Sequence, residues 1–497
     1  MKKALSILLL ILLLICPSCA KSAGGQLFDA VYTDCFDTVS SLSAQVESAS
    51  SFALLQQGLH AEMQELHALF DVYNDAKTSN LKTLNDAAGS HPVALDARVL
   101  DLLSCALDFA QLSGGAVQPM MGAVTVLWKS AAQSGVLPSA DQIIAARAHI
   151  DPAALIVDKS AGTAYISDPQ ARVDVGAFAK GYAARLLGAW LENQGCENFL
   201  LSLGGNIYAH GVDPRTGKNW QVSVRDPQNG GAAVPGFHLN DDRALVTSGS
   251  YERFFTLNGK NYHHIIDPAT GYPSARTNVV SVSVLHSDPL FADALSTALF
   301  ILERAEGEKL LQVVGGSALY IYGDGTIERA AGFPTETSTN TADLIVLIAL
   351  PSALGIAVAL WLWQRKKGEQ TKKSPFPKFR KRDCVFLCLV LLIALLLPLL
   401  LLFGGKNAEQ YDAVVRIDGK EVCRLPLNKN AEYRAESSLG SNLIVIKDGK
   451  AFVADADCPG GDCTRCAAID EHSTIPVIAC LPHKLTITIE AQEVQNA

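Results

Sequence analysis

Four short motifs between residues 174 and 297 hold the residue types that phosphoryl chemistry on a nucleotide requires. They offer glycine turns for close backbone approach, one lysine for phosphate charge, one histidine that could move a proton, and oxygen ligands for a hard cation. In chain order they read Asp174-Val-Gly-Ala-Phe-Ala-Lys-Gly-Tyr182, Leu203-Gly-Gly-Asn206, His264-Ile-Ile-Asp-Pro-Ala-Thr-Gly271 and Asp293-Ala-Leu-Ser-Thr297. The set indicates phosphoryl chemistry on a dinucleotide without a P-loop or a Rossmann fingerprint.

Asp293 and Thr297 are candidate ligands of Mg²⁺. They stand four residues apart in an apolar run, so on a helix they share one face. A carboxylate and a hydroxyl form a hard oxygen pair that suits Mg²⁺. The same two residues have a plain alternative, in which the aspartate serves a helix N-terminus and the threonine bonds back to its own helix.

Lys180 and His264 are the candidates for phosphate binding and proton transfer. Lys180 follows a small-residue turn that can bring backbone N–H groups to an anion, and it adds a point charge. His264 could accept the proton of an attacking hydroxyl group. An exposed helix lysine and a structural histidine remain the alternatives. Leu203-Gly-Gly-Asn206 is either a strand end that a ligand approaches or an ordinary tight turn.

The elements that must position these residues predict an α+β fold, because separate helices mix with short strands rather than repeating as βαβ units. Helices are expected over 40–70, from His91-Pro92 to Gly114-Gly115, and over 177–193 and 290–302. Strands are expected at Leu155–Val157, Ala164–Ile166, Phe199–Leu203, Gln221–Arg225, Ala244–Val246 and Val279–Leu285. Residues 405–497 have strand-sized runs with Asp-Gly turns, which predict a small all-β domain.

Three apolar runs and the charge distribution predict where the protein works. Residues 1–19 are typical of a signal peptide of the lipoprotein type, in which Cys19 is the acylated residue. A plain export signal and an uncleaved anchor are the alternatives. The runs 344–363 and 384–403 predict two transmembrane helices, and the loop 364–383 between them holds nine Lys/Arg, which predicts a cytoplasmic loop. The catalytic and C-terminal domains are then extracytoplasmic, at a cell membrane and in contact with membrane lipid. A net charge of −9 argues against nucleic acid as a partner.

Taken together, the four motifs resemble the FAD:protein FMN transferase family, also called ApbE-like proteins. The resemblance covers roughly residues 30–332 and extends to Thr247-Ser-Gly249 and to Gly114-Gly-Ala116. It implies an ApbE-like α+β domain over 20–333, followed by a linker at 334–343. It also implies that FAD is the substrate and Mg²⁺ the cofactor, and that FMN is transferred to a Thr or Ser hydroxyl of a target flavoprotein with release of AMP.

The resemblance assigns roles residue by residue. The metal ligands are Asp293, Thr297 and the backbone carbonyl of Ala177, and His264 is the proton acceptor or phosphate contact. The nucleotide contacts are Phe36, Tyr73, Ala116, Val117, Gln118, Lys180 and Ile266. The chain departs from the family pattern at Gln118, where an aspartate is usual, and at Phe36-Asp37-Thr38, where Met-Gly-Thr is usual.

The function predicted from this resemblance is a membrane-anchored FMN transferase that matures flavoproteins of membrane electron-transfer systems. Two rival hypotheses use the same site. One is an FAD pyrophosphatase that gives FMN and AMP, and the other is a non-catalytic flavin-binding or docking protein, which the departures at Phe36 and Gln118 favour.

The C-terminal part of the chain, residues 411–490, resembles the second domain of NusG, here fused through the two predicted spans. The resemblance depends on Ile417-Asp-Gly419, Asp457-Cys-Pro459, Cys463 and Cys480-Leu-Pro-His483. The spacing of Cys458, Cys463 and Cys466, with Cys480 after them, leaves three states open: disulfides, as expected outside the cell, free thiols, or a metal or iron–sulfur site.

Overall fold

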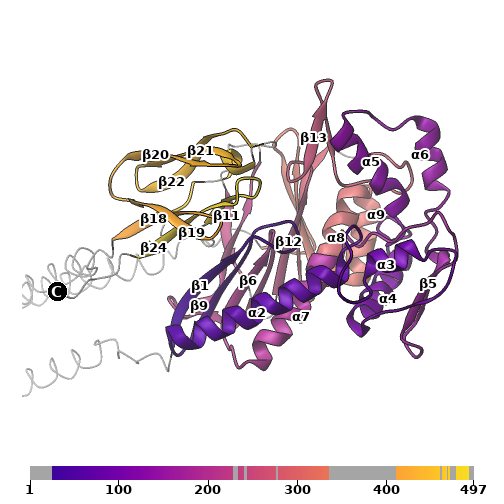
Figure 1. Ribbon diagram of the computed structural model, residues 1–497, viewed down its shortest axis with the longest axis horizontal. Coiled ribbons are helices and arrows are strands. Elements are labelled where there is room, and N and C mark those ends of the chain that lie inside the picture. Colours follow the sequence, from indigo (N-terminus) through magenta and orange to yellow (C-terminus); the bar gives the residue numbers. More distant parts are fainter. Residues whose placement is uncertain are drawn as a thin grey trace, which may run out of the picture.

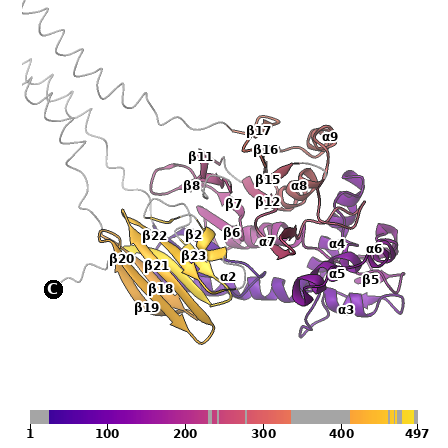
Figure 2. The same cartoon turned by 90° about the horizontal axis from the view of Figure 1, so that it is seen from above.

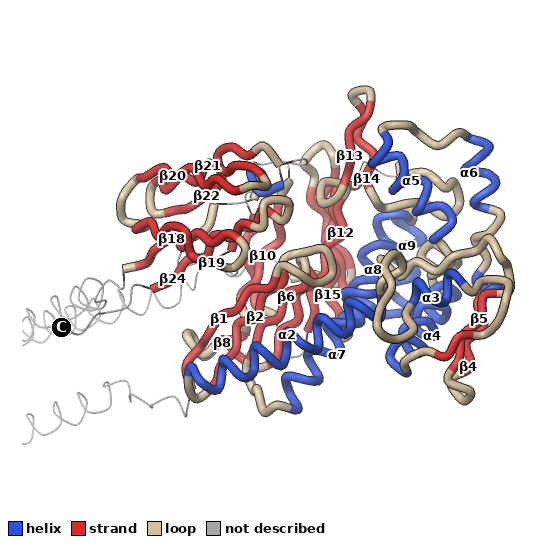
Figure 3. The backbone as a smooth tube through the Cα atoms, in the orientation of Figure 1, coloured by secondary structure: helices blue, strands red, loops and turns tan. Residues whose placement is uncertain are grey.

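The computed structural model describes residues 25–227, 233–239, 243–275, 278–334, 410–458, 462–466, 468–470 and 477–491. The residues before 335 mix helices and strands, and those after 409 are mainly strands (Figures 1 and 3). This arrangement confirms the α+β fold predicted for the first part and the all-β character predicted for the last.

The first part is built on one eight-stranded sheet, in which every neighbouring pair of strands is antiparallel. In spatial order its strands are β1 (Gln26–Tyr32), β2 (Ser40–Val46), β6 (Phe199–Leu203), β7 (Asn206–His210), β12 (Arg243–Gly249), β15 (Val279–His286), β16 (Ser317–Tyr322) and β17 (Ile327–Ala330). Both faces of this sheet are covered, because alternate residues of its strands enter two different cores. On β15, Val282 and Val284 enter the core under the helices, whereas Leu285 enters a second core around Trp220.

Three helices pack on one face of the sheet, and the middle one, α7 (Ala179–Asn193), contacts both of the others (Figures 1 and 2). The other two are α2 (Ala49–Phe70) and α8 (Pro289–Ile301). Helix α8 is apolar around most of its circumference because it lies between α7 and the strands β12 and β15. A polar residue on α8, such as Asp293, is therefore placed in the interior.

The remaining helices gather beyond one end of the sheet in both views (Figures 1 and 2). They are α3 (Leu81–Asp86), α4 (Ala97–Leu112), α5 (Gly122–Ser134) and α6 (Ala140–Arg147), with α9 (Arg304–Val314) next to α8. The small strands are β3 (Val93–Ala94), β4 (Leu155–Asp158), β5 (Thr163–Ile166), β8 (Val212–Asp213), β9 (Lys218–Asn219), β10 (Gln221–Arg225), β11 (Ala233–His238), β13 (Phe254–Leu257) and β14 (Lys260–His263).

The C-terminal part holds two antiparallel sheets around one apolar core. One sheet has the order β19 (Lys420–Pro426), β18 (Tyr411–Ile417), β24 (Leu485–Ala491), β23 (Val477–Cys480), and the other the order β20 (Ala431–Ser437), β21 (Gly440–Lys447), β22 (Lys450–Ala456). The predicted turns at Asp418-Gly419 and Asp448-Gly449 are present, with positive φ at all four residues.

The predicted fold class is corrected in one respect, the two transmembrane helices. No helix in the described part of the chain is both long and apolar enough to cross a membrane. Helix α8 is apolar but has 13 residues, or about 20 Å against a hydrocarbon core of about 30 Å. Both predicted spans, 344–363 and 384–403, lie outside the described residues, as does the predicted signal peptide. The fold assigned here is the α+β unit with the small β unit.

A second correction concerns residues 40–70, which the apolar spacing predicted to be one helix. Residues Ser40–Val46 form strand β2, and the helix begins at Ala49. Leu42 and Ala44 alternate with half-buried polar residues, as period-2 burial requires, and β2 pairs with β6. Long-range pairing therefore decides the structure of a segment whose local pattern is ambiguous.

Candidate functional site

Helices α7 and α8 meet at Gly181, and this contact places Asp293. A Cβ atom at position 181 would lie 2.6 Å from the Asp293 Cβ and 2.9 Å from the Leu290 Cα, inside the carbon–carbon contact distance of about 3.5 Å. Without that atom, the Gly181 N–H donates to Asp293 Oδ2 at 2.8 Å. Phe178, the N-cap of α7, provides no side-chain cap, so a carboxylate from the neighbouring helix caps α7 instead.

The same hydrogen bond changes the environment of Ala177. In a regular helix the N–H of residue 181 would bond the carbonyl four residues earlier, which is that of Ala177. That N–H is directed to Asp293. The Gly181 N–H is therefore used by Asp293, and Ala177 precedes the same end of α7 in the chain.

Asp293 is an acidic group held in a buried position. Its residue is 4% exposed, and burial raises its pKa above the ordinary value. The charge of Lys180, the Gly181 N–H and the side-chain amide of Asn206 act in the opposite direction and lower this pKa. Lys180 and Asn206, from separate predicted motifs, thus both influence this carboxylate, although the Asn206 Nδ2 makes no hydrogen bond among the described residues.

Thr297 lies one helical turn after Asp293 and has hydroxyl neighbours. Its Oγ1 donates to the Asp293 carbonyl at 3.4 Å and lies 3.2 Å from Ser248 Oγ on β12. The Ser248 hydroxyl is also 2.8 Å from Ser296 Oγ. The alternative in which Thr297 bonds back to its own helix is therefore confirmed. The carboxylate and hydroxyl oxygens gathered here are also hard donors of the kind that Mg²⁺ prefers.

His264 stands directly after the β13–β14 hairpin, where the charge of Lys180 reaches it. Its Nδ1 lies 3.0 Å from the carbonyl oxygen of Arg253, so Nδ1 donates and Nε2 is the acceptor nitrogen. The residue is exposed, yet surrounding protein atoms and the positive charges of Arg253 and Lys180 lower its pKa to about 4, against a smaller raising effect of the Arg253 carbonyl. The histidine is therefore neutral at pH 7 and can accept a proton.

Arg253 ties this hairpin to the N-terminal turn. Its Nη2 donates to the Asp37 carbonyl at 2.9 Å. Phe36 and Asp37 have φ of 57° and 51°, the left-handed region that glycine adopts without strain. This geometry gives a physical reason for the glycine that the family pattern has at position 37, and it makes the turn of this chain a strained one.

Tyr73 is close enough to Asp37 and Arg253 for their charges to reach it. The loop after α2 holds it, with 44% of its surface exposed and Lys129 Nζ 2.9 Å from the ring centroid. Burial of its hydroxyl and the charges of Asp174, Asp71 and Asp37 raise its pKa to about 12, while Arg253 acts in the opposite direction. An exposed aromatic face beside these charged groups can stack on a planar ring.

Gln118 is buried at the start of the segment that leads into α5. The residue is 5% exposed, and its Oε1 has no hydrogen-bond partner among the described residues. Pro119 follows it, and the Pro119 carbonyl accepts from the Asp174 N–H at 2.7 Å. A buried acceptor without a partner is costly, so Gln118 is a fitting position for a donor group of a bound ligand.

The structure does not place every predicted nucleotide contact on an open surface. The side chain of Phe36 is buried edge-on to His67 at 5.8 Å, and that of Val117 is also in the main core. Ile266 packs in a small apolar cluster with Trp128 and Ile143. These three residues can support the binding surface through their backbone, whereas their side chains serve mainly packing.

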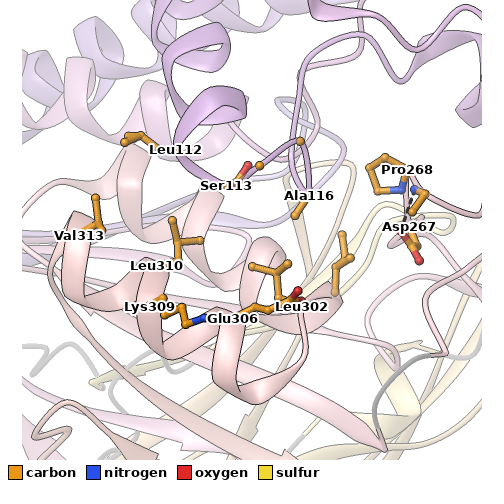
Figure 4. A pocket seen from close by; sticks show the side chains of 14 residues that line it. Leu112, Ser113, Ala116, Asp267, Pro268, Leu302, Glu306, Lys309, Leu310 and Val313 are labelled. Atoms are coloured by element: carbon orange, nitrogen blue, oxygen red, sulfur yellow. Dashed lines mark hydrogen bonds between the residues drawn. The ribbon is translucent and has the colours of Figure 1, made fainter.

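A pocket of about 460 Å³ lies beside the site rather than at the metal-ligand candidates (Figure 4). Its walls come from the end of α4, the turn after Asp267 and helix α9, and of the predicted site residues only Ala116 lines it. The predicted chemistry is located instead where α7, α8 and β12 meet. Figure 4 shows Glu306 and Lys309 on the wall opposite Asp267.

Two residues of the site were missed by the sequence prediction. Ser248 lies within the motif Thr247-Ser-Gly249, which was noted for its position but not given a role. Arg253 belongs to no motif, and only its contacts with Asp37 and His264 identify it.

The two family models that match the chain agree with its two parts. The model of the ApbE family matches residues 36–321, and that of NusG domain II matches residues 386–493. The chain is 36% identical over 292 residues to an FAD:protein FMN transferase of Treponema pallidum, covering 55% of this chain and 80% of that protein. With the enzyme of the same name from Escherichia coli K12 it is 30% identical over 278 residues, or 55% and 77% of the two chains.

Solved structures show the same fold. The flavin transferase ApbE from Vibrio cholerae superposes with a TM-score of 0.55 at 25% sequence identity, over 62% of this chain and 97% of that one. The ApbE protein of Thermotoga maritima gives a TM-score of 0.54 at 27% identity, over 62% and 98% of the two chains.

Proposed function

The chain belongs to the ApbE family, and we infer that it is an FAD:protein FMN transferase. It transfers FMN from FAD to a Thr or Ser hydroxyl of a target flavoprotein and releases AMP. The observation that carries this function is the match to transferases of that name across 80% of the length of one of them, with the candidate residues gathered at one helix junction.

Mg²⁺ is the cofactor that we propose for this site. Asp293, Thr297 and the carbonyl of Ala177 are the residues that would hold it, because they offer hard oxygen atoms at the α7–α8 junction. The raised pKa of Asp293 supports the proposal, since a buried carboxylate near one lysine is stabilised further by a divalent cation. When bound, the ion would offset charge on the pyrophosphate.

Lys180 and His264 are the polar groups that we place around the reacting phosphate. Lys180 adds positive charge next to Asp293, and its charge also reaches His264. His264 Nε2 is available to take the proton of the acceptor hydroxyl, because Nδ1 is engaged by the Arg253 carbonyl. The chain's main contribution is to position the hydroxyl in line with the phosphorus and to stabilise charge.

Gln118 and Tyr73 are the side chains that we propose to grip the nucleotide. The unpartnered Oε1 of Gln118 can accept a hydrogen bond from a ribose hydroxyl or an adenine amino group. Tyr73 can stack on a ring system. The amide at position 118 preserves an acceptor where the family usually has a carboxylate, which supports retained FAD binding.

We propose that the protein acts outside the cytoplasm on flavoproteins of membrane electron-transfer systems. The signal-peptide pattern of residues 1–19 supports this location, and an acyl chain on Cys19 would hold the protein to membrane lipid. Protease treatment of intact cells tests the location, because only an outward-facing chain is digested without lysis. Mass measurement of the N-terminal peptide tests acylation.

The transfer reaction is tested with the full chain, FAD, Mg²⁺ and a flavoprotein target carrying an acceptor threonine. A fluorescent flavin band that stays on the denatured target, with an equal amount of AMP, is the expected result. FMN and AMP without that band would indicate a pyrophosphatase, and bound FAD without turnover would indicate a binding protein. Thr297→Val should lose the band, whereas Glu306→Gln, on the neighbouring pocket wall, should retain it.

A further inference from the structure

Three cysteines from separate elements converge at one end of the C-terminal β unit. Cys458 follows β22, Cys463 lies in a short 3₁₀ turn at Asp462–Arg465, and Cys480 ends β23. The sulfurs of Cys458 and Cys463 are 3.8 Å apart, and all three sulfurs lie within 4.8 Å of one another. Cys463 and Cys480 are buried, whereas Cys458 is half-buried.

The three sulfurs form a compact triangle. A zinc ion lies about 2.3 Å from each thiolate of a tetrahedral site, so two sulfurs that share the ion are about 3.8 Å apart. The separation of Cys458 and Cys463 has this value. A disulfide would use only two of these sulfurs, whereas a metal ion would use all three.

The hydrogen bonds around the triangle favour thiolates. The Asn442 amide and the His483 backbone N–H donate to Cys480. The Asn442 Nδ2 also lies 3.3 Å from Cys463 Sγ. Thiolates are the form of cysteine that binds metal ions.

A chain of polar residues orients Asn442. Its Oδ1 is 2.7 Å from Nδ1 of His483, which is 2% exposed, and Nε2 of the same histidine is 3.3 Å from Asp457 Oδ1. Because the Asn442 amide donates to sulfur, its Oδ1 must accept from His483. Gly440 leaves room for this chain, since a Cβ there would overlap the His483 ring and Asp457. Partners of this kind fix the ligands of metal sites.

We propose that Cys458, Cys463 and Cys480 bind one Zn²⁺ ion as thiolates, with a water molecule in the fourth position. Binding displaces the protons of the thiols that are still protonated and changes no oxidation state. The ion would join β22, the 3₁₀ turn and β23, which pack around the small apolar core of this unit. This site is independent of the flavin reaction.

Cobalt substitution tests the proposal directly. The full chain is reduced, stripped with a chelator and titrated with Co²⁺, and we expect thiolate-to-cobalt charge-transfer bands in the near ultraviolet together with visible bands of a tetrahedral site. Co²⁺ at the oxygen ligands proposed for Mg²⁺ gives no thiolate bands. Zn²⁺ should abolish the bands at one equivalent per chain, and a large excess of Mg²⁺ should not.

Matched cysteine variants identify the ligands. Cys463→Ser and Cys458→Ser should lose the thiolate bands, and circular dichroism checks that each variant is folded. Cys423→Ser, on β19 and outside the cluster, should keep them. Asn442→Ala should weaken Zn²⁺ binding about 10- to 100-fold. The proposal is overturned if the reduced chain takes up no Co²⁺, or if peptide mapping of the unreduced chain shows a disulfide between two of the three cysteines.

Discussion

Replacing Gly181 with alanine should separate α7 from α8 and displace Asp293. The new Cβ would meet the Pro289 carbonyl oxygen, the Leu290 Cα at 2.9 Å and the Asp293 Cβ at 2.6 Å. Two of these three atoms are backbone atoms, and the third is attached directly to the backbone, so no side-chain rotation relieves the contact. The helices must move apart by about 1 Å to restore normal carbon–carbon separations.

The cost follows from the contacts that this movement breaks. Overpacking of this kind destabilises by about 1–3 kcal/mol. The Gly181 N–H to Asp293 bond, 2.8 Å long, would stretch beyond hydrogen-bonding distance, at a cost of about 1.5–3 kcal/mol for a bond to a charged acceptor. Alanine gains about 1 kcal/mol in helix propensity. The net loss is about 1.5–5 kcal/mol, or a fall in Tm of roughly 3–15 °C.

Thermal unfolding followed by circular dichroism measures the stability, and covalent FMN transfer below the lowered Tm measures the site. We expect transfer to fall at least about 10-fold, because the Asp293 carboxylate is displaced at the α7–α8 junction. Gly307→Ala is the matched control, since its nearest neighbours are the ends of the Leu299 and Tyr320 side chains, which can move. The reasoning is refuted if Gly181→Ala has the Tm and transfer rate of Gly307→Ala.

Three further predictions concern single side chains. Asp293→Asn should reduce Mg²⁺-dependent transfer at least about 100-fold, yet leave Tm at pH 7 unchanged or higher. The reason is that burial raises the pKa of Asp293. The contribution of this carboxyl group to stability is therefore present at low pH and is lost as the pH rises through that pKa. A lower Tm would contradict this. His264→Ala should slow transfer about 100-fold. Because the pKa of His264 is lowered to about 4, this histidine destabilises the fold as the pH falls from about 6.5 toward 4. A pH series of Tm values should therefore show a smaller loss of stability over that range for the variant than for the unchanged protein. Gln118→Leu should keep or raise Tm, since an unpartnered buried oxygen is removed. It should also weaken FAD binding about 10-fold in a titration, because one hydrogen bond contributes about that much. Unchanged affinity would show that Gln118 does not touch FAD.

Much of the sheet could be predicted because the local apolar pattern of its strands is typical of strands. Phe199–Leu203 is a continuous apolar run before two glycines, and it forms β6 with the same bounds. The strand β2 could not be predicted, since its apolar spacing runs on into that of α2 and only pairing with β6 decides between them. Length and periodicity alone favour the longer helix.

The candidate site also holds residues that the sequence could identify and residues that it could not. Asp293 and Lys180 could be identified because each lies in a motif with a recognisable spacing, and the structure brings both to one helix end. Arg253 could not, because its role depends on two carbonyl contacts that connect distant segments. Phe36 was predicted as a ligand contact from the family pattern alone, and its side chain packs against His67 in the core.

The pairing of β2 with β6 also constrains the order of folding. Ser40 lies opposite Leu203, so the first hairpin of the chain has no neighbour in the sheet until most of the domain has been synthesised. The long segment between β2 and β6 closes slowly. Until β6 pairs with it, the β1–β2 hairpin exposes an unpaired strand edge. The sheet is therefore expected to assemble late and through non-local contacts, with a period during which the nascent chain depends on protection from aggregation.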